Sequence, residues 1–216
     1  MTKMTEFQEH FTYSAVINDN PKELLSNKYL NGKSKRAFDL LFTILVLPVG
    51  LPLLLLCTAW LLITVGLPVV FAQKRVGRNG RQFTMLKLRT LRNGANNHNG
   101  TRHEPGDITI AGRILRAVKV DELPQMWNII KGEMSWVGPR PEVPFYVEKY
   151  TDIDPKFRFR LLALPGITGI AQLNNPNATP EDNLDKLKHD LHYIKNASLW
   201  MDIKILIKTF LVIWKN

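Results

Sequence analysis

An uninterrupted apolar segment dominates the pattern of hydrophobic and polar positions along the chain. From Leu40 to Ala72 the sequence runs 33 residues without a charged side chain. As a straight helix this segment would be about 50 Å long, against a membrane hydrocarbon core of about 30 Å. It is therefore too long for one comfortable crossing and too short for two. Pro48 and Pro52 lie within it, and because an internal proline removes a helical hydrogen bond, we expect a sharp bend at 48–52.

Basic residues flank this segment on both sides, which bears on its topology. The positive-inside rule favours the cytoplasmic side for both flanks, and a single span cannot satisfy that. The pattern therefore predicts a re-entrant helix–break–helix over 33–72, with an ordinary tilted transmembrane helix as the open alternative. The flanking cations are Lys33, Lys35 and Arg36 before the segment and Lys74, Arg75, Arg78 and Arg81 after it.

The next segment, Val69–Thr90, has the pattern of a β-hairpin. The tetrapeptide Arg78-Asn79-Gly80-Arg81 is a turn signal between two β-prone runs. Because side chains alternate along a strand, Lys87 and Arg89 are expected on one face. Such paired cations suit phosphate binding, but a solvated strand face or a lipid-headgroup contact is equally compatible with the pattern.

Two adjacent carboxylates, Asp121 and Glu122, precede an apolar helical pattern that ends at Gly132. We expect Asp121 to be the N-cap and Gly132 the C-cap of a short helix. A helix N-terminus attracts anions, so a carboxylate there suits a nucleophile or metal ligand that meets a phosphate. From these residues alone, a purely structural cap is the more common explanation.

Two arginines accompany this acidic pair. A short basic helix over 111–118 delivers Arg116 just before Asp121. Arg140 stands between Pro139 and Pro141, and the proline that follows it restricts its backbone to extended conformations. A side chain held this firmly suits a preorganised fork for phosphate or carboxylate, while pairing with Glu142 or another nearby acid is the structural alternative.

Two further helices are predicted toward the C-terminus. The first, over 181–195, is charged and carries His189 and His192 without an evident third metal ligand. The second, over 198–216, combines a narrow lysine stripe with a wide apolar face, as in a helix lying in the membrane interface. A core helix with a thin wet edge is the alternative. His98 and His103, in a loop over 93–106, show no metal spacing.

Composition narrows the function classes. Of the net charge of +10, a net of +9 lies between Gln73 and Lys119, with eleven basic and two acidic residues. This block must face something anionic: nucleic acid, lipid headgroups or a phosphorylated substrate. Cys57 is the only cysteine, which excludes an intrachain disulfide, and no secretory signal is visible. The sequence also lacks a Walker A loop, a dinucleotide-binding motif, zinc spacing and a hydrolase nucleophile elbow.

Together these patterns predict one functional domain, mainly α with a short β-hairpin (α+β), in a monotopic membrane protein. Its expected parts are a weakly structured lead-in at 1–32, the re-entrant membrane helix at 33–72, a cytoplasmic catalytic part at 73–197 and an interfacial amphipathic helix at 198–216.

Several of these motifs agree with one family. The chain resembles the monotopic phosphoglycosyl transferases, bacterial sugar transferases that act on polyprenyl phosphate, in a minimal form without a preceding multi-span region. The resemblance covers about residues 33–213, and it departs from the family at Leu51, where a serine is familiar. The matching residues are Lys35–Asp39, Pro52, Gln73–Gly77, Gly80, Phe83, Lys87–Thr90, Asp121–Gln125, Asn128, Gly132, Met134, Ser135, Val137–Glu142, Pro165–Gly169, Gln172, Asp190 and Tyr193.

The resemblance implies that Asp121 attacks the β-phosphorus of a UDP-sugar and releases UMP. Polyprenyl phosphate would then take the sugar phosphate from the aspartate. It further implies Mg²⁺ held by Asp121, and Glu122 assisting with metal, phosphate or protons. The substrate-binding residues that it implies are Arg116, Arg140, Lys87, Arg89, Gln125, Asn128 and Gln172.

The implied setting is the cytoplasmic face of a bacterial inner membrane, in the initiating step of a surface glycan. The implied partners are a UDP-sugar, polyprenyl phosphate and membrane lipid but no nucleic acid, and a homo-oligomer is compatible with the sequence. Two other classes stay open: a membrane-tethered scaffold that binds anionic lipid without catalysis, and a nucleic-acid binder that uses the basic block at 73–119.

Overall fold

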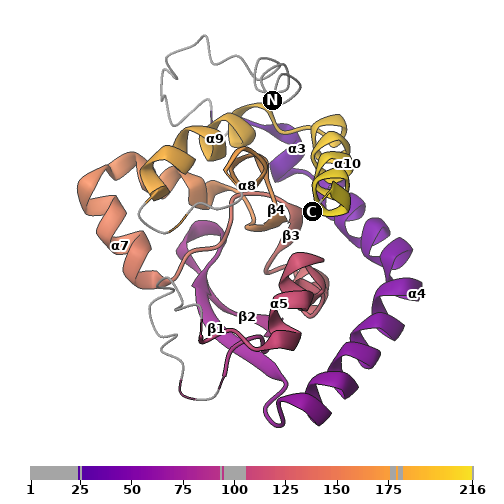
Figure 1. Cartoon of the computed structure of the whole chain (residues 1–216). Coiled ribbons are helices and arrows are strands. Elements are labelled where there is room, and N and C mark those ends of the chain that lie inside the picture. The colour runs from indigo at the N-terminus through magenta and orange to yellow at the C-terminus, as the bar shows by residue number, and fades with distance from the viewer. Residues whose placement is uncertain are drawn as a thin grey trace.

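The computed structural model describes residue 24, residues 26–92, residue 94, residues 106–175, residue 179 and residues 182–215. Over these ranges the chain is mostly helical, with one hairpin and one pair of short parallel strands (Figure 1). The predicted fold class is confirmed. Most of the expected lead-in and the loop with His98 and His103 lie outside the described residues. The elements in chain order are α3 (Lys28–Asn31), α4 (Lys33–Thr64), β1 (Val70–Val76), η1 (Arg78–Gly80), β2 (Gln82–Leu88), α5 (Ile110–Ala117), η2 (Val120–Glu122), α6 (Gln125–Lys131), β3 (Ser135–Val137), α7 (Pro144–Ile153), η3 (Pro155–Leu162), β4 (Gly166–Thr168), α8 (Ile170–Asn174), α9 (Asn183–Asn196) and α10 (Leu199–Lys215).

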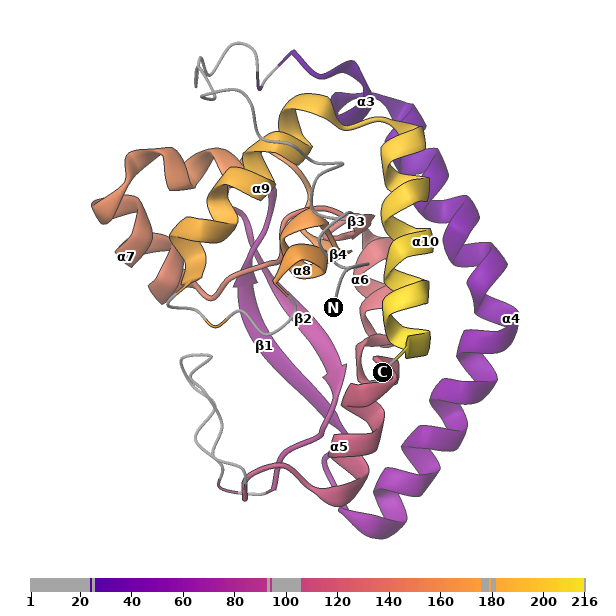
Figure 2. The same ribbon diagram turned by 45° about the horizontal axis from the view of Figure 1, so that its top comes forward.

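The apolar segment forms the single long helix α4, which contains Pro48 and Pro52. The expected helix–break–helix is thus a continuous helix, and Figures 1 and 2 show its ribbon bending along its length. A proline removes one hydrogen bond and crowds the preceding turn, which bends a helix without having to end it. The helix stops at Thr64, before Gly66 at a positive φ of 76°, and 70–72 belong to β1 instead.

Both ends of α4 contact the rest of the protein. Near its start, Arg36 donates to the carbonyls of Ile129 and Ile130 at the C-terminal end of α6. Near its end, Leu61 is fully buried against Leu88 of β2 and Leu115 of α5. The helix therefore starts and ends against the rest of the protein, hereafter called the body, as Figure 2 shows.

The hairpin forms as predicted. β1 and β2 pair antiparallel from Val70 opposite Leu88 to Val76 opposite Gln82. The turn places Asn79 and Gly80 at positive φ (56° and 77°), which suits the Asn-Gly dipeptide. One antiparallel bridge between Val76 and Glu142 extends the hairpin and connects it to the segment that carries Arg140.

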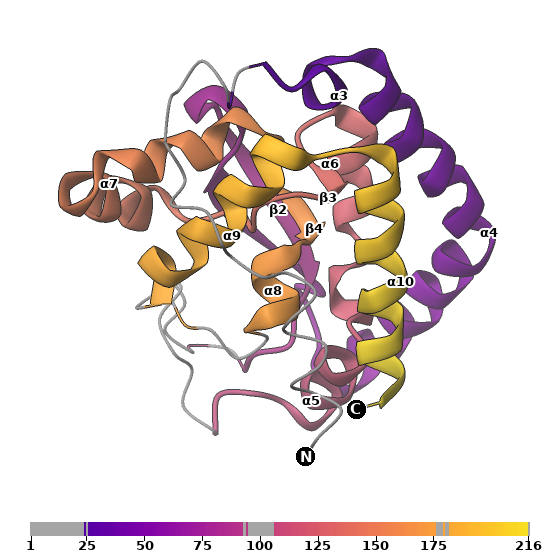
Figure 3. The same cartoon turned by 90° about the horizontal axis from the view of Figure 1, so that it is seen from above.

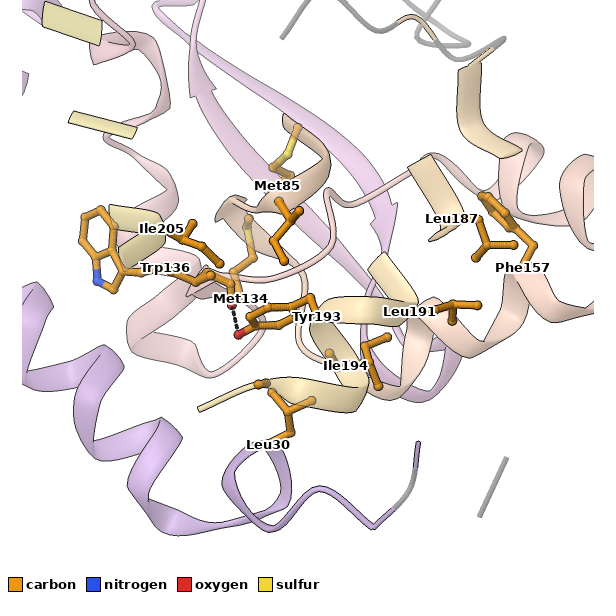
Figure 4. Packing of buried hydrophobic residues seen from close by; sticks show 14 of the residues in the cluster. Leu30, Met85, Met134, Trp136, Phe157, Leu187, Leu191, Tyr193, Ile194 and Ile205 are labelled. Atoms are coloured by element: carbon orange, nitrogen blue, oxygen red, sulfur yellow. Dashed lines mark hydrogen bonds between the residues drawn. The ribbon is translucent and has the colours of Figure 1, made fainter. Parts of the chain in front are cut away.

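The main core lies where α9, β3, α6 and the hairpin meet. Met85, Met134, Leu187 and Ile194 are buried in it, and Tyr193 donates its hydroxyl to the carbonyl of Val137 (Figure 4). α9 is half buried along its length, because its apolar side and Asp190 face this core.

α10 lies beside the first half of α4 (Figures 2 and 3) and is fastened there by buried ionic groups. Asp202 is fully buried and accepts from Lys35 Nζ at 2.6 Å and from the hydroxyls of Tyr29 and Tyr193, each at 2.8 Å. Lys35 also pairs with Asp39 at 3.3 Å. The sequence pattern does not predict this network, because Tyr29 and Lys35 lie far from Asp202 along the chain.

Large apolar side chains remain exposed on the outer faces of α4, α5 and α10. Examples are Val49 (73 % exposed), Ile63 (84 %), Ile110 (78 %) and Trp214 (80 %). α4 is the one helix in the described ranges that is long and apolar enough to cross a membrane by length and composition. Such surface is typical of a membrane contact, so α10 combines the two predicted alternatives: one face packs on the body and the other is apolar and exposed.

Candidate active site

The acidic pair lies in a tight turn between two helices. Lys119 adopts a left-handed conformation (φ 58°) after α5, which redirects the chain into η2, where Asp121 and Glu122 lie. α6 then begins at Gln125 and ends at Gly132, whose φ of 79° makes it the predicted C-cap. The prediction that Asp121 is an N-cap is wrong, because η2 follows Lys119 and the cap of α6 is Pro124, with no side-chain cap at either position.

Glu122 is buried and held by two cations. Lys87 Nζ lies 2.7 Å from its Oε1, and Arg140 Nη2 lies 3.4 Å from the same oxygen. Burial alone would raise the pKa of Glu122, but Lys87 and Arg140 outweigh that effect and lower it to about 2. Glu122 is therefore an ionised carboxylate engaged by its neighbours.

Asp121 is also buried, at 6 % exposed, but its carboxylate has no hydrogen bond or ion pair to any described residue. Burial raises its pKa, an effect that Lys87 and Arg116 partly offset and the Glu122 charge reinforces. A carboxylate that is poorly solvated and not engaged is more basic and more reactive than a paired one. The two adjacent acids thus differ in environment, and Asp121 is the one free to react.

The arginine turn at 139–141 is held by two other arginines. Arg160 Nη2 donates to the carbonyl of Arg140 at 2.9 Å, and Arg75 Nη1 donates to the carbonyl of Pro141 at 2.9 Å. The side chain of Arg140 keeps 40 % of its surface exposed beside Glu122. Arg140 thus pairs with a neighbouring acid, and the alternative partner Glu142 pairs with Arg75 and Arg160 instead.

Arg116 and Lys87 complete the charged group. Arg116 donates from Nε to Thr90 Oγ1 at 2.8 Å, which leaves its terminal nitrogens for other contacts. Burial lowers the pKa of both Arg116 and Lys87, while the acidic pair opposes that shift. The structure therefore brings together five of the predicted site residues: Lys87, Arg116, Asp121, Glu122 and Arg140.

Three other predicted residues are not part of this charged group. Arg89 donates to the carbonyls of Val65 and Gly66 at the C-terminal end of α4. Asn128 ties α6 to β2, because it accepts from the amide of Leu86 and donates to the carbonyl of Thr84. Gln125 is 2 % exposed within the body, and its Nε2 has no hydrogen-bond partner.

A pocket of about 500 Å³, a size typical of small-molecule sites, is lined by Glu122 but not by Asp121 itself. Gln172 lines it and donates to the carbonyl of Ile167 at 2.9 Å. The polar members of the lining are Lys119, Glu122, Trp136, Arg140, Arg160, Thr168, Gln172, Asn175, Lys186 and Thr209; the apolar members are Phe42, Val46, Val118, Val120, Leu123, Met126, Ile167, Ala171, Leu173, Leu206, Phe210, Val212 and Ile213.

Sequence reasoning missed Arg160 and did not assign a role to Asp190. Their side chains pair at 2.8 Å behind the Arg140 turn, and burial raises the pKa of Asp190 to about 6. No local motif marks Arg160, and only its tertiary contacts give it a role. The only sequence signal for Asp190 is its place among the residues that match the family.

The donor set is compatible with Mg²⁺ at Asp121. Mg²⁺ commonly takes one or two protein carboxylates and completes its shell with water and phosphate oxygens, and the free Asp121 carboxylate beside Glu122 meets that description. No cluster of three metal-ligating side chains occurs in the described residues. His189 and His192 contact Asn174 and Asn196, respectively.

Comparison with known proteins identifies the family of the chain. The model of the family described as "Bacterial sugar transferase" matches residues 30–216, and the chain belongs to this family. The sequence prediction of a sugar-transferase enzyme is thereby confirmed, and a purely scaffolding function is not favoured.

Named relatives support the same class. The chain is 36 % identical to a UDP-N-acetylgalactosamine-undecaprenyl-phosphate N-acetylgalactosaminephosphotransferase of Aeromonas hydrophila, over 81 % of this chain and 42 % of that protein. It is 37 % identical to a UDP-glucose:undecaprenyl-phosphate glucose-1-phosphate transferase of Caulobacter vibrioides, over 81 % of this chain and 67 % of that protein. The exopolysaccharide production protein ExoY of Sinorhizobium fredii is 35 % identical over 88 % of this chain and 89 % of its own length. The chain thus spans less than half of the Aeromonas relative.

Proposed function

We propose that this protein transfers a sugar 1-phosphate from a UDP-sugar to undecaprenyl phosphate and releases UMP. The family supports sugar transfer, and the names of the relatives support the nucleotide donor and the lipid acceptor. These relatives differ in the sugar they carry, so the proposal extends to the class of UDP-sugars. The observation that carries it is the contrast between the engaged Glu122 and the free Asp121.

The proposed reaction has two steps. An Asp121 oxygen attacks the β-phosphorus of the UDP-sugar, and the bond from that phosphorus to the bridging oxygen breaks, so that UMP leaves with the oxygen. The sugar phosphate is then bound to the aspartate. An oxygen of undecaprenyl phosphate attacks the same phosphorus, the bond to the carboxylate breaks, and the lipid diphosphate sugar is released. Splitting a transfer through a covalent intermediate replaces one difficult step by two easier ones.

The surrounding cations stabilise the phosphoryl charge. Arg140 is fixed through its backbone by Arg160, and Arg116 is oriented by Thr90, so both are preorganised rather than recruited during the reaction. Lys87 binds Glu122 and thereby keeps that carboxylate ionised. When bound at Asp121, Mg²⁺ would neutralise diphosphate charge.

The proposed location is the cytoplasmic face of the bacterial inner membrane, where a water-soluble nucleotide sugar and a lipid can share one site. The exposed apolar surface of α4 and α10 supports this location. The proposed role is the initiating step of a surface glycan, consistent with the relative named for exopolysaccharide production.

Replacing Asp121 by asparagine tests the proposal. We expect Asp121→Asn to reduce UMP release from UDP-sugar in the presence of undecaprenyl phosphate and magnesium by at least about 10³-fold, because the nucleophile is lost. Radiolabelled sugar phosphate should remain on the wild-type protein when acceptor is withheld and be absent from the variant. Asp152→Asn, at an exposed position of α7, is the matched control. Undiminished transfer of label to lipid by Asp121→Asn would contradict the proposal.

A further inference from the structure

The pocket that Glu122 lines has two kinds of wall. Besides Glu122, its charged lining residues are the cations Lys119, Arg140, Arg160 and Lys186. This charge balance suits an anionic group. Two helices supply much of the rest: Phe42 and Val46 come from α4, and Leu206, Thr209, Phe210, Val212 and Ile213 come from α10.

The helical walls are well defined. Phe42 and Val46 are four residues apart and so lie on one face of α4, and the α10 residues recur at spacings of three and four. Trp136 packs edge-on against Phe42 at 5.0 Å and donates to Thr43 Oγ1 at 2.9 Å, which fixes α4 at the pocket. Thr209 and Thr168 share a hydrogen bond of 2.7 Å, which fixes α10.

The apolar side of the pocket reaches the exposed surface of the protein. Phe210 lines the pocket and is also 64 % exposed. The adjacent outer positions Ile207 and Leu211 are 55 % and 50 % exposed, and α4 presents further apolar side chains nearby. A ligand with a phosphate at the cationic side of the pocket could therefore extend an apolar chain between α4 and α10 toward lipid.

We propose that the space between α4 and the last turns of α10 binds the isoprenoid units of the acceptor nearest to its phosphate. This inference rests on the proposed acceptor and assigns it a place. Because the pocket has the volume of a small-molecule site, it holds only the first part of a long polyprenyl chain. A nucleotide sugar has no apolar segment to occupy this wall, so it fits the polar part alone.

Filling the apolar wall tests the proposal. Val46→Trp and Ile213→Trp place bulk in the pocket, and Ile207→Trp places the same bulk on the exposed face of α10 as the matched control. Equilibrium binding of radiolabelled undecaprenyl phosphate to the purified proteins in lipid nanodiscs is measured first, because it does not depend on the reaction. We expect both pocket variants to bind about tenfold or more weakly than wild type, and Ile207→Trp to bind like wild type.

UMP release in a single turnover without acceptor is measured on the same proteins. We expect it to stay near the wild-type level in the pocket variants, which also shows that they are folded. Unchanged lipid binding in both pocket variants, or no binding by wild type, would overturn the proposal. If the pocket variants lost UMP release together with lipid binding, the proposal would also be overturned, because the apolar wall would then bind the nucleotide sugar. Weakened lipid binding in proteins that release no UMP, wild type included, would support the pocket and refute the proposed reaction instead.

Discussion

Asp121 and Glu122 are adjacent in sequence and differ in chemistry because of their neighbours. Lys87 and Arg140 hold Glu122 ionised, whereas Asp121 has no such ion pair with a described residue and is buried with a raised pKa. Pairs of carboxylates whose pKa values are pushed apart are typical of sites in which each has a separate task. With its pKa lowered to about 2, Glu122 is an unsuitable proton donor at neutral pH, and its carboxylate pairs with Lys87 and Arg140.

This arrangement predicts a pH-dependent contribution of Glu122 to stability. Its pKa falls from 4.5 in the unfolded chain to about 2 in the folded protein. The resulting stabilisation, roughly 3 kcal/mol, is complete above pH 4.5 and is lost as pH falls toward 2. We expect the difference in the free energy of unfolding between wild type and Glu122→Gln to shrink over that range. Denaturant unfolding in detergent at several pH values measures it, and a difference that stays constant with pH would contradict the prediction.

For individual residues, the sequence predicted the site residues that a local motif marks and missed those whose role depends on tertiary contacts. The acidic pair and the Pro-flanked Arg140 could be found because local chemistry marks them. Arg89 lies two residues after Lys87, which predicts that both point to one face of the strand, yet Arg89 contacts the end of α4 rather than the site. That difference depends on where α4 ends, which strand periodicity cannot reveal.

The parallel pairing of β3 with β4 positions the arginine turn. Ser135 pairs with Gly166 and Val137 with Thr168, so Arg140 follows directly from a buried strand. Its partner strand β4 spans only Gly166–Thr168. Two three-residue strands separated by a long insertion give no periodic signal, and their pairing depends on close approach of the backbones.

Glycine makes that approach possible at position 138. A Cβ there would lie 2.3 Å from the carbonyl oxygen of Leu164, which is too close for any side chain. We expect Gly138→Ala to destabilise the protein by at least about 2 kcal/mol and to lower UMP release by displacing the Arg140 turn. Gly106→Ala, with no atom within 4 Å of the added Cβ, is the control. Thermal unfolding and activity are measured together, and wild-type behaviour of Gly138→Ala would contradict the close packing.

At the scale of the whole molecule, the body and its membrane surface are joined by α4. The helix starts beside α10 and ends beside α5, and both ends are held by buried contacts with the same body. The sequence predicted this return from the two basic flanks. It could not predict that the helix would stay continuous through Pro48 and Pro52, because a proline bends some helices and ends others, and the packing of α4 on α6 decides between them.

A helix that returns to its own body should keep both flanks on one side of the membrane. In a Cys57→Ser background, Lys33→Cys and Lys74→Cys place single thiols at exposed positions on either side of the apolar segment. We expect a membrane-impermeant maleimide to label both in inverted membrane vesicles and neither in intact cells, because the proposed face is cytoplasmic. The Cys57→Ser protein, which contains no cysteine, is the control for background labelling. Labelling of one position from each side would show that α4 crosses the bilayer, since no helix held at both ends by one cytoplasmic body could produce that pattern.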